Sequence, residues 1–141
     1  MIVAALEPWL KFRSDPALPG LILEYGEEHG VTPDPDWPGM QRIAMVSELH
    51  VVTLRTSVLG GFCICVMRPQ LGFKGKMLAF AELIFVRPEY RPDGTHLLLV
   101  ETQKRMREHG ASHFALHHAP AIASLGALGF GTSMRAWIKE L

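Results

Sequence analysis

Apolar and polar positions divide the middle of the chain into strands and turns. The segments 49–56 and 62–67 are rich in Val, Leu, Ile and Cys, and the polar and glycine-containing stretch 57–61 separates them. This pattern predicts an antiparallel hairpin. After a loop at 68–76, the run MLAFAELIFV at 77–86 is apolar throughout except for one glutamate. Such a run predicts a strand that is buried on both faces.

The segment that follows predicts a turn and a helix. Pro88 has no N–H to donate to a sheet and disfavours helical geometry in the residue before it, so the strand is expected to end there. A loop at 87–95 contains two prolines, two arginines and a glycine. A helix is expected at 96–109, with Gly110 in the position of a left-handed C-cap. A strand, a turn and a helix N-terminus in this order form a ready site for a phosphate-bearing ligand.

The first third of the chain has shorter patterns. We expect a short edge strand at 2–6 and helical segments at 8–13 and 20–29. The segment 32–39 contains three prolines and predicts a loop. Residues 40–49 again have a helical pattern. These elements would precede the hairpin.

The last third predicts one more strand, a helix and a final strand. Residues 111–117 alternate in the manner of a strand, and we expect this strand to pair in parallel with 77–86 across the crossover helix. A short helix rich in Ala and Leu is expected at 119–128 and a strand at 133–138. The order predicts an α+β fold in a single domain, residues 1–141.

Composition narrows the class of function. The chain has 141 residues, 48% of them hydrophobic, and a formal net charge of zero. A neutral chain without runs of like charge argues against nucleic-acid and membrane-surface binding. No apolar stretch is long enough to span a bilayer, and the N-terminus lacks the pattern of a secretory signal. Cys63 and Cys65 lie too close for an ordinary disulfide framework and are interpreted as small buried residues. A cytoplasmic location is expected.

The residues from 77 to 110 resemble a known family. The strand 77–86, the lead-in VRPEYR at 86–91, the loop RPDGTH at 91–96 and the helix after it resemble the acetyl-coenzyme A motif of GNAT-type N-acetyltransferases, Q/R-x-x-G-x-G/A. The LGF sequence at 128–130 is similar to the motif that closes a later helix in that family. The resemblance implies a GNAT fold, which is a mixed, mostly antiparallel sheet with a central parallel strand pair flanked by helices. In layout the chain is also similar to small GNAT proteins of bacteriophage genomes.

The resemblance implies acetyl-coenzyme A as cosubstrate and a binding site for it. The backbone at the end of the strand would pair with the pantetheine arm, and the loop and first helical turn would hold the pyrophosphate. The residues implied are Ile84, Phe85, Val86, Arg87, Arg91, Asp93, Gly94, Thr95 and His96. The sequence departs from the motif at Pro92, which removes an N–H donor, and at His96, where the family has a small residue. The alternative interpretation of R-P-D-G is an ordinary turn.

The acceptor side is expected in the variable segment 1–39, because two helices wall the acceptor site in this family. Tyr25, Glu28 and Trp37 are the candidate substrate-binding residues. The alternative for each of them is a solvated helix face. The expected acceptor is a small-molecule amine or a protein amine, and the resemblance leaves a homodimer open.

Glu82 is the candidate general base, since it is the one charge in an apolar strand. Burial of an unpaired carboxylate would raise its pKa above about 4.3, towards useful base strength. Many members of the family carry a glutamate at this position. The alternative is a structural glutamate paired with an arginine.

The acid that protonates the departing thiolate is harder to identify. The position of the tyrosine that serves many family members corresponds to Leu125, which has no proton to donate. His118 is the candidate replacement. The alternative is that His113, His117 and His118 are surface residues at the end of a strand. A zinc site is excluded by the lack of ligand spacing, so no metal is expected. An acetyltransferase and a non-catalytic GNAT-fold module that binds acyl-coenzyme A or serves as an assembly partner both remain open.

Overall fold

The structure, a computed structural model, describes residues 1–70, 72 and 74–116. Its strands form a five-stranded sheet in the order β1-β2-β3-β4-β5. The neighbours pair antiparallel from β1 to β4, whereas β4 and β5 pair in parallel. The strands are β1 (Val3–Glu7), β2 (Leu49–Arg55), β3 (Leu59–Pro69), β4 (Met77–Val86) and β5 (His113–Leu116). The helices are α1 (Trp9–Arg13), α2 (Leu18–His29), α3 (Trp37–Met45), the 3₁₀ turn η1 (Pro88–Tyr90) and α4 (Asp93–Glu108).

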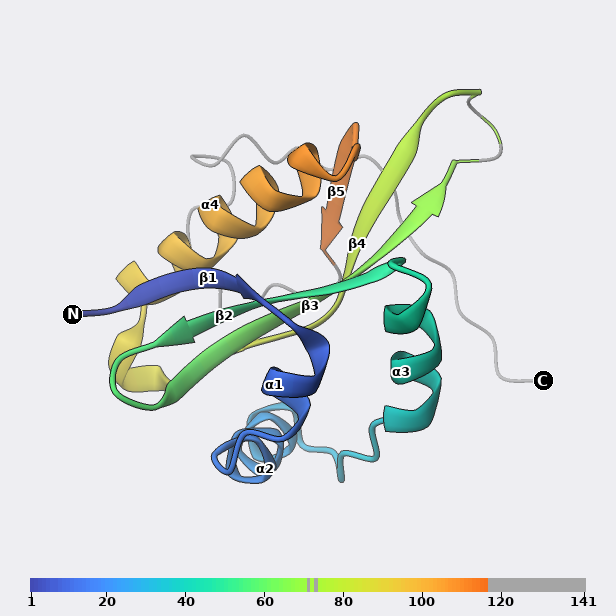
Figure 1. The fold of residues 1–141 in the computed structure, drawn as a ribbon. Coiled ribbons are helices and arrows are strands. Elements are labelled where there is room, and N and C mark those ends of the chain that lie inside the picture. The colour runs from blue at the N-terminus through green and yellow to red at the C-terminus, as the bar shows by residue number, and fades with distance from the viewer. Residues whose placement is uncertain (71, 73, 117–141) are drawn as a thin grey trace.

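Helices cover both faces of the sheet (Figure 1). The helix α4 packs on one face, where Leu98 and Met106 join the buried side chains of β2, β3 and β4. The helices α1, α2 and α3 lie on the other face, around a core that contains Phe12, Phe62 and Phe85. Because each strand alternates its side chains between the two faces, the single sheet supports two separate cores.

The strand β4 contains a β-bulge at Glu82. Leu83 lies opposite Ile64 of β3, but the next pair along the ladder is Ala81 with Cys65, so Glu82 has no partner residue. A bulge inserts one residue and changes the direction of side chains after it. The described pairing of β4 with β5 runs from Leu78 with His113 to Ala81 with Leu116, the last residue that the structure describes.

The predicted fold class is confirmed, and three helices begin earlier than predicted for a common reason. The first turn of α2 contains Pro19 and that of α3 contains Pro38, while Pro92 is the N-cap residue of α4. Proline is favoured in a first helical turn, where its missing N–H would have no partner. Pro38 and Pro92 lie in the predicted loops 32–39 and 87–95, so those loops are shorter than expected. The structure shows that α3 starts inside the predicted loop 32–39, with the Asp36 carboxylate accepting a bond of 3.0 Å from the Gly39 N–H.

The strands agree with the prediction, with small changes in length. The edge strand β1 ends at Glu7, and β3 is longer at both ends than the predicted 62–67. Cys63 and Cys65 are buried on β3 as expected. The predicted helix at 119–128, the LGF sequence and the final strand at 133–138 lie outside the described residues. In the described part of the chain, no helix is both long and apolar enough to cross a membrane.

Candidate functional site

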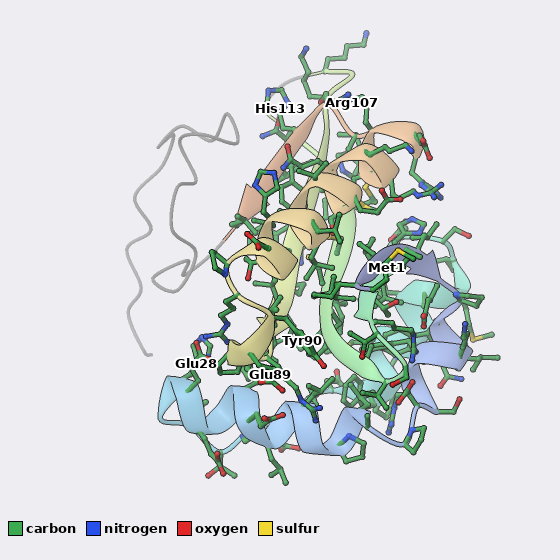
Figure 2. All side chains as sticks on the ribbon, turned by 90° about the vertical axis from the view of Figure 1, so that its left-hand side faces the viewer. Met1, Glu28, Glu89, Tyr90, Arg107 and His113 are labelled. Atoms are coloured by element: carbon green, nitrogen blue, oxygen red, sulfur yellow. The ribbon has the colours of Figure 1, made fainter. Side chains whose placement is uncertain are left out.

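A small cavity lies where β4 meets the start of α4. It has a volume of about 40 Å³, and we call it the junction cavity; it is lined by Glu28, His29, Ile84, Phe85, Val86, Arg91 and Thr95. Five of the nine residues predicted to bind the cofactor are in this list, namely Ile84, Phe85, Val86, Arg91 and Thr95. Figure 2 shows Glu28 on α2 beside the turn that carries Tyr90, at the start of α4.

Arg91 spans the junction cavity. Its Nε donates to the Val86 carbonyl at 2.7 Å. Its Nη1 and Nη2 donate to the Glu28 carboxylate at 3.0 and 2.6 Å, which makes a two-pronged ion pair. The guanidinium also lies 5.4 Å from the centre of the Phe85 ring. Arg91 is therefore held by a backbone carbonyl, an aromatic face and a carboxylate, and only the carboxylate matches what an anionic ligand would offer.

Thr95, at the start of α4, has a buried hydroxyl that faces the junction cavity. The residue is 6% exposed, and its Oγ1 has no hydrogen-bond partner among the residues that the structure describes. Buried hydroxyl groups are nearly always bonded, so an unpartnered one that lines a cavity indicates a ligand contact. The first N–H groups of α4 also lack partners within the helix and give its N-terminus a partial positive charge. The arrangement suits an anion.

Gly94 serves packing and does not line the cavity. A Cβ at this position would lie 2.8 Å from the Leu54 Cδ2 and 3.1 Å from the Tyr90 Cβ. The glycine therefore lets the first turn of α4 approach the sheet. This is a different reason from the one that the motif implies, in which a small residue gives phosphate access to the loop.

The other predicted cofactor residues lie beside the junction cavity. Arg87 pairs with Glu24 of α2 at 3.0 Å, parallel to the pair between Arg91 and Glu28. Residues 24 and 28 are one helical turn apart, so two ion pairs connect α2 to the end of β4. Asp93 and His96 are exposed in the first turn of α4.

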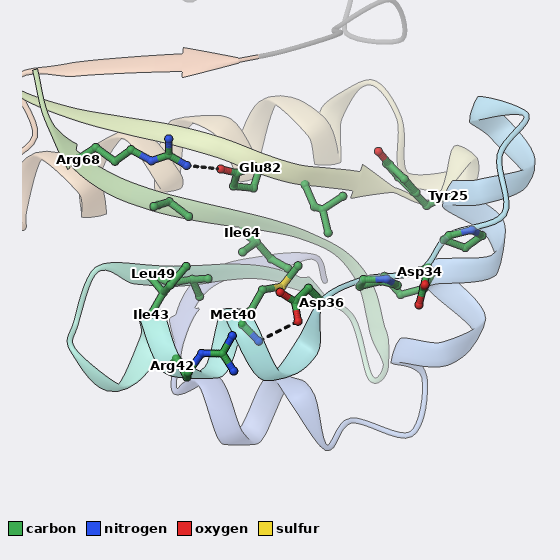
Figure 3. Close-up of a pocket in the computed structure, with 16 residues that line it drawn as sticks. Tyr25, Asp34, Asp36, Met40, Arg42, Ile43, Leu49, Ile64, Arg68 and Glu82 are labelled. Atoms are coloured by element: carbon green, nitrogen blue, oxygen red, sulfur yellow. Dashed lines mark hydrogen bonds and ion pairs between the residues drawn. The ribbon is translucent and has the colours of Figure 1, made fainter. Parts of the chain in front are cut away.

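A larger cavity lies between α3 and the sheet (Figure 3). It has a volume of about 540 Å³, and we call it the α3 cavity. It is lined by Ile22, Tyr25, Pro33, Asp34, Pro35, Asp36, Gly39, Met40, Arg42, Ile43, Leu49, Ile64, Val66, Arg68, Glu82 and Leu83. The α3 helix has no buried residue. Its apolar side chains Met40 and Ile43 face the sheet, but they leave the α3 cavity between the helix and the sheet.

The bulge in β4 directs Glu82 into the α3 cavity. Ala81 packs in the core beneath α4, whereas Glu82 and Leu83 both line the α3 cavity. Two successive side chains on the same face are what a bulge produces. The prediction that Glu82 is buried is wrong, because its side chain is 37% exposed and accepts a bond of 2.9 Å from Arg68 of β3. The alternative, a glutamate paired with an arginine, is the arrangement that the structure shows.

Only one of the three predicted acceptor residues lines the α3 cavity. Tyr25 does, and its ring stands edge-on to Phe85 with 6.4 Å between centres. Glu28 lies in the junction cavity instead. Trp37 packs against Trp9 at 6.1 Å and beneath the Arg13 guanidinium at 4.4 Å, away from the cavity. Since Tyr25 and Phe85 touch, the two cavities are neighbours along β4.

Sequence reasoning missed the residues that α3 and β3 contribute. Met40, Ile43 and Arg68 line the α3 cavity but were not singled out. The apolar pair Met40 and Ile43, three apart on a short helix, could have indicated a face with an incomplete core. His118 and Leu125 lie outside the described residues. Among the residues that the structure describes, no group of His, Cys, Asp and Glu side chains is arranged to hold a metal ion.

Comparisons with known proteins bear on the fold. No protein-family model matches the sequence, and neither does any curated protein. The aminoglycoside acetyltransferase HMB0005, from an uncultured soil metagenomic sample, matches with a TM-score of 0.74 at 14% identity over 100% of this chain and 99% of that chain. The complex of AAC(6')-Iy with a coenzyme A bisubstrate analogue matches at 0.69 and 18% identity, over 100% and 98% of the two chains. A predicted acetyltransferase from Clostridium acetobutylicum, with acetyl-CoA, matches at 0.75 and 10%, over 100% and 96%.

The chain has the fold of GNAT acetyltransferases. At these identities the likeness concerns the path of the backbone, and function has to be argued from the site. Within the acetyltransferase fold, this chain places the junction cavity and the α3 cavity at successive positions along β4. The narrower resemblance to bacteriophage proteins stays a prediction.

Proposed function

We propose that this protein is an acetyl-coenzyme A-dependent N-acetyltransferase that acts on a small-molecule amine. The observation that carries the proposal is the bulge in β4. It directs Glu82 into the α3 cavity, while Ile84, Phe85 and Val86, which follow on the same strand, line the junction cavity. A donor bound along this end of β4 would lie next to an acceptor bound beneath α3.

The junction cavity fits the pyrophosphate of coenzyme A in its chemistry. The Thr95 hydroxyl and the free N–H groups at the start of α4 would donate to phosphate oxygens. Arg91 would contribute a guanidinium, a group that binds phosphate through two parallel bonds. The backbone of β4 from Leu83 to Val86 would bind the pantetheine amides as a neighbouring strand would.

The junction cavity is too small to receive a phosphate group as it stands. Its 40 Å³ is little more than the volume of a water molecule. The Glu28 carboxylate is bonded to Nη1 and Nη2 of Arg91, the two groups that would otherwise donate to a phosphate. Binding therefore requires Arg91 to exchange Glu28 for phosphate, and Glu28 competes with the cofactor.

Acetyl-coenzyme A supplies an activated acetyl group as a thioester, and the residues of the α3 cavity prepare the amine. An incoming ammonium group would displace Arg68 from Glu82, since both cations bind the same carboxylate. Glu82 would then take a proton from the ammonium group and leave a nucleophilic amine. Until the amine arrives, the bond from Arg68 holds the carboxylate in place at the cavity.

Calorimetry with the variant Thr95→Val tests the proposal. The substitution removes an unpartnered buried hydroxyl and keeps the shape, so it should leave the free protein equally stable or more stable. The same substitution should weaken acetyl-coenzyme A binding by about tenfold, the value of one hydrogen bond to a charged group. The matched control is Thr102→Val on the same helix, whose hydroxyl bonds to the Leu98 carbonyl at 2.7 Å. Equal affinity in both variants would contradict the placement of the cofactor.

A non-catalytic acyl-coenzyme A-binding module is the second candidate, and the pair between Arg68 and Glu82 favours it. In that case the ion pair is structural and no amine displaces it. The release of free thiol from acetyl-coenzyme A, measured with and without amines, separates the two. Binding without amine-dependent thiol release would support the module.

A further inference from the structure

The α3 cavity is apolar inside and charged only at particular places. Its walls include Ile22, Met40, Ile43, Ile64, Val66 and Leu83, which come from α2, α3, β3 and β4. A volume of about 540 Å³ is within the range of cavities that hold small organic molecules. An occupant that fills this space would remove the apolar side chains of its walls from water, which favours binding.

The charges that line the α3 cavity are nearly balanced. Three carboxylates, from Asp34, Asp36 and Glu82, accompany two guanidinium groups, from Arg42 and Arg68. The Asp36 carboxylate is engaged in capping α3, and the Glu82 carboxylate is engaged with Arg68. Asp34 and Arg42 are exposed at the rim. Glu82 is therefore the one carboxylate that rises from the sheet among the apolar walls.

We propose that the acceptor is a primary monoamine with an aromatic or branched-alkyl body, whose ammonium group binds Glu82 and whose body fills the space beneath α3. This inference rests on the proposed function and specifies its substrate class. The reaction forms a bond between the amine nitrogen and the acetyl carbon and breaks the thioester C–S bond. Of the two protons that the ammonium group loses, Glu82 takes the first and water takes the second. Coenzyme A leaves as thiolate.

A polycationic acceptor does not suit this cavity. Each further ammonium group would enter an apolar space, and a buried charge without a partner is strongly unfavourable. Asp34 is the one lining carboxylate that has no bonded partner among the described residues, and it lies at the rim. Arg42 and Arg68 would repel additional positive charge. The sugar-based and polyamine acceptors, which carry several amines, are therefore expected to be poor.

An amine panel tests the substrate class. Phenethylamine, 3-methylbutylamine and methylamine have one ammonium group and bodies of decreasing size, while spermidine and sisomicin carry several ammonium groups. Thiol release should give a kcat/KM for phenethylamine that is roughly 10- to 100-fold above that for methylamine, as burial of a phenyl-sized group implies. Spermidine and sisomicin should fall at or below methylamine.

Two variants of Ile43 locate the body of the amine. Ile43→Trp should fill the cavity and reduce kcat/KM for phenethylamine at least tenfold, with methylamine little affected and calorimetric binding of acetyl-coenzyme A unchanged. Met45→Trp, on the exposed side of the same helix, is the matched control and should behave as the wild type. Ile43→Thr keeps the branch at Cβ but replaces the ethyl group by a hydroxyl, so it should reduce the preference for phenethylamine over methylamine without crowding the cavity.

The results separate the two levels of the proposal. Preference for spermidine or sisomicin, in a protein that binds acetyl-coenzyme A and releases thiol, would overturn the substrate class and leave the acetyltransferase intact. Equal effects of Ile43→Trp and Met45→Trp would also overturn it. If acetyl-coenzyme A did not bind at all, the proposed function would fail, and this inference with it.

Discussion

The helices on the two faces of the sheet are packed in opposite ways. The α4 helix buries Leu98, Leu99 and Met106 among others, whereas α3 buries no residue. Both helices present apolar side chains to the same sheet, so hydrophobicity alone does not explain the difference. The face beneath α4 contributes stability through close packing, and the face beneath α3 keeps space for a ligand. We call the side of the sheet beneath α4 the closed face and the side beneath α3 the open face. Substitutions on the open face are expected to disturb the fold less than substitutions on the closed face.

The largest effect on activity is expected at Glu82, which extends from the open face into the α3 cavity. Glu82→Gln keeps the shape and removes the base, so kcat with phenethylamine should fall by about 10²–10⁴-fold while acetyl-coenzyme A affinity changes little. Calorimetry and thiol release measure the two quantities. Glu89→Gln, in the exposed η1 turn, is the control. An unchanged kcat would assign Glu82 a structural role in its pair with Arg68.

The packing difference itself predicts unequal losses of stability. Leu98→Ala removes a side chain that is fully buried beneath α4, and its free energy of unfolding should fall by about 2–5 kcal/mol. Ile43→Ala, at a partly buried position of α3, should cost about 1 kcal/mol, since the side chain borders a cavity and has fewer packing contacts to lose. Urea unfolding measures both. Equal losses would mean that α3 is packed as tightly as α4.

Much of the closed face was predictable from the sequence because its elements are neighbours along the chain. The strand, turn and helix from Met77 to Glu108 follow one another in the chain, so periodicity and turn residues were enough. The open face was not predictable in the same way. The pair between Arg68 and Glu82 depends on the register between β3 and β4, and no glycine in β4 marks the bulge that directs Glu82. Trp37 illustrates the limit, since its place in the acceptor-side segment 1–39 suggested a binding role, whereas its ring packs against Trp9 and Arg13.

A smaller effect is expected where α2 borders the junction cavity. Glu28→Gln removes the carboxylate that competes for Arg91, so acetyl-coenzyme A should bind about two- to fivefold more tightly, as the modest strength of a partly exposed ion pair implies. Glu24→Gln is the matched control, because its partner Arg87 does not line the cavity. Calorimetry at low and high salt compares them. Weaker binding by Glu28→Gln would show that Glu28 supports the cofactor site and does not compete with it.

The smallest effect concerns the pH dependence of stability at Glu7, the last residue of β1. Burial would raise the pKa of Glu7, but hydrogen bonds from Arg55 and Thr53 outweigh it and leave the pKa below its ordinary value. The folded protein then binds fewer protons than the unfolded chain below about pH 4.5, so the stabilising contribution is present above that pH and is lost as pH falls. Glu7→Gln should unfold with a shallower dependence on pH below 5. Glu27→Gln, exposed on α2, should retain the wild-type slope.

The bulge in β4 makes position 82 tolerant of substitution. Glu82 is the residue of β4 that the ladder with β3 skips, so Ala81 and Leu83 keep their partners whatever side chain occupies position 82. Chemistry at this position is therefore separate from the pairing that holds the sheet together. A lineage could exchange one reactive group for another here while its sheet stayed intact, and a library randomised at position 82 alone should consist mostly of folded proteins.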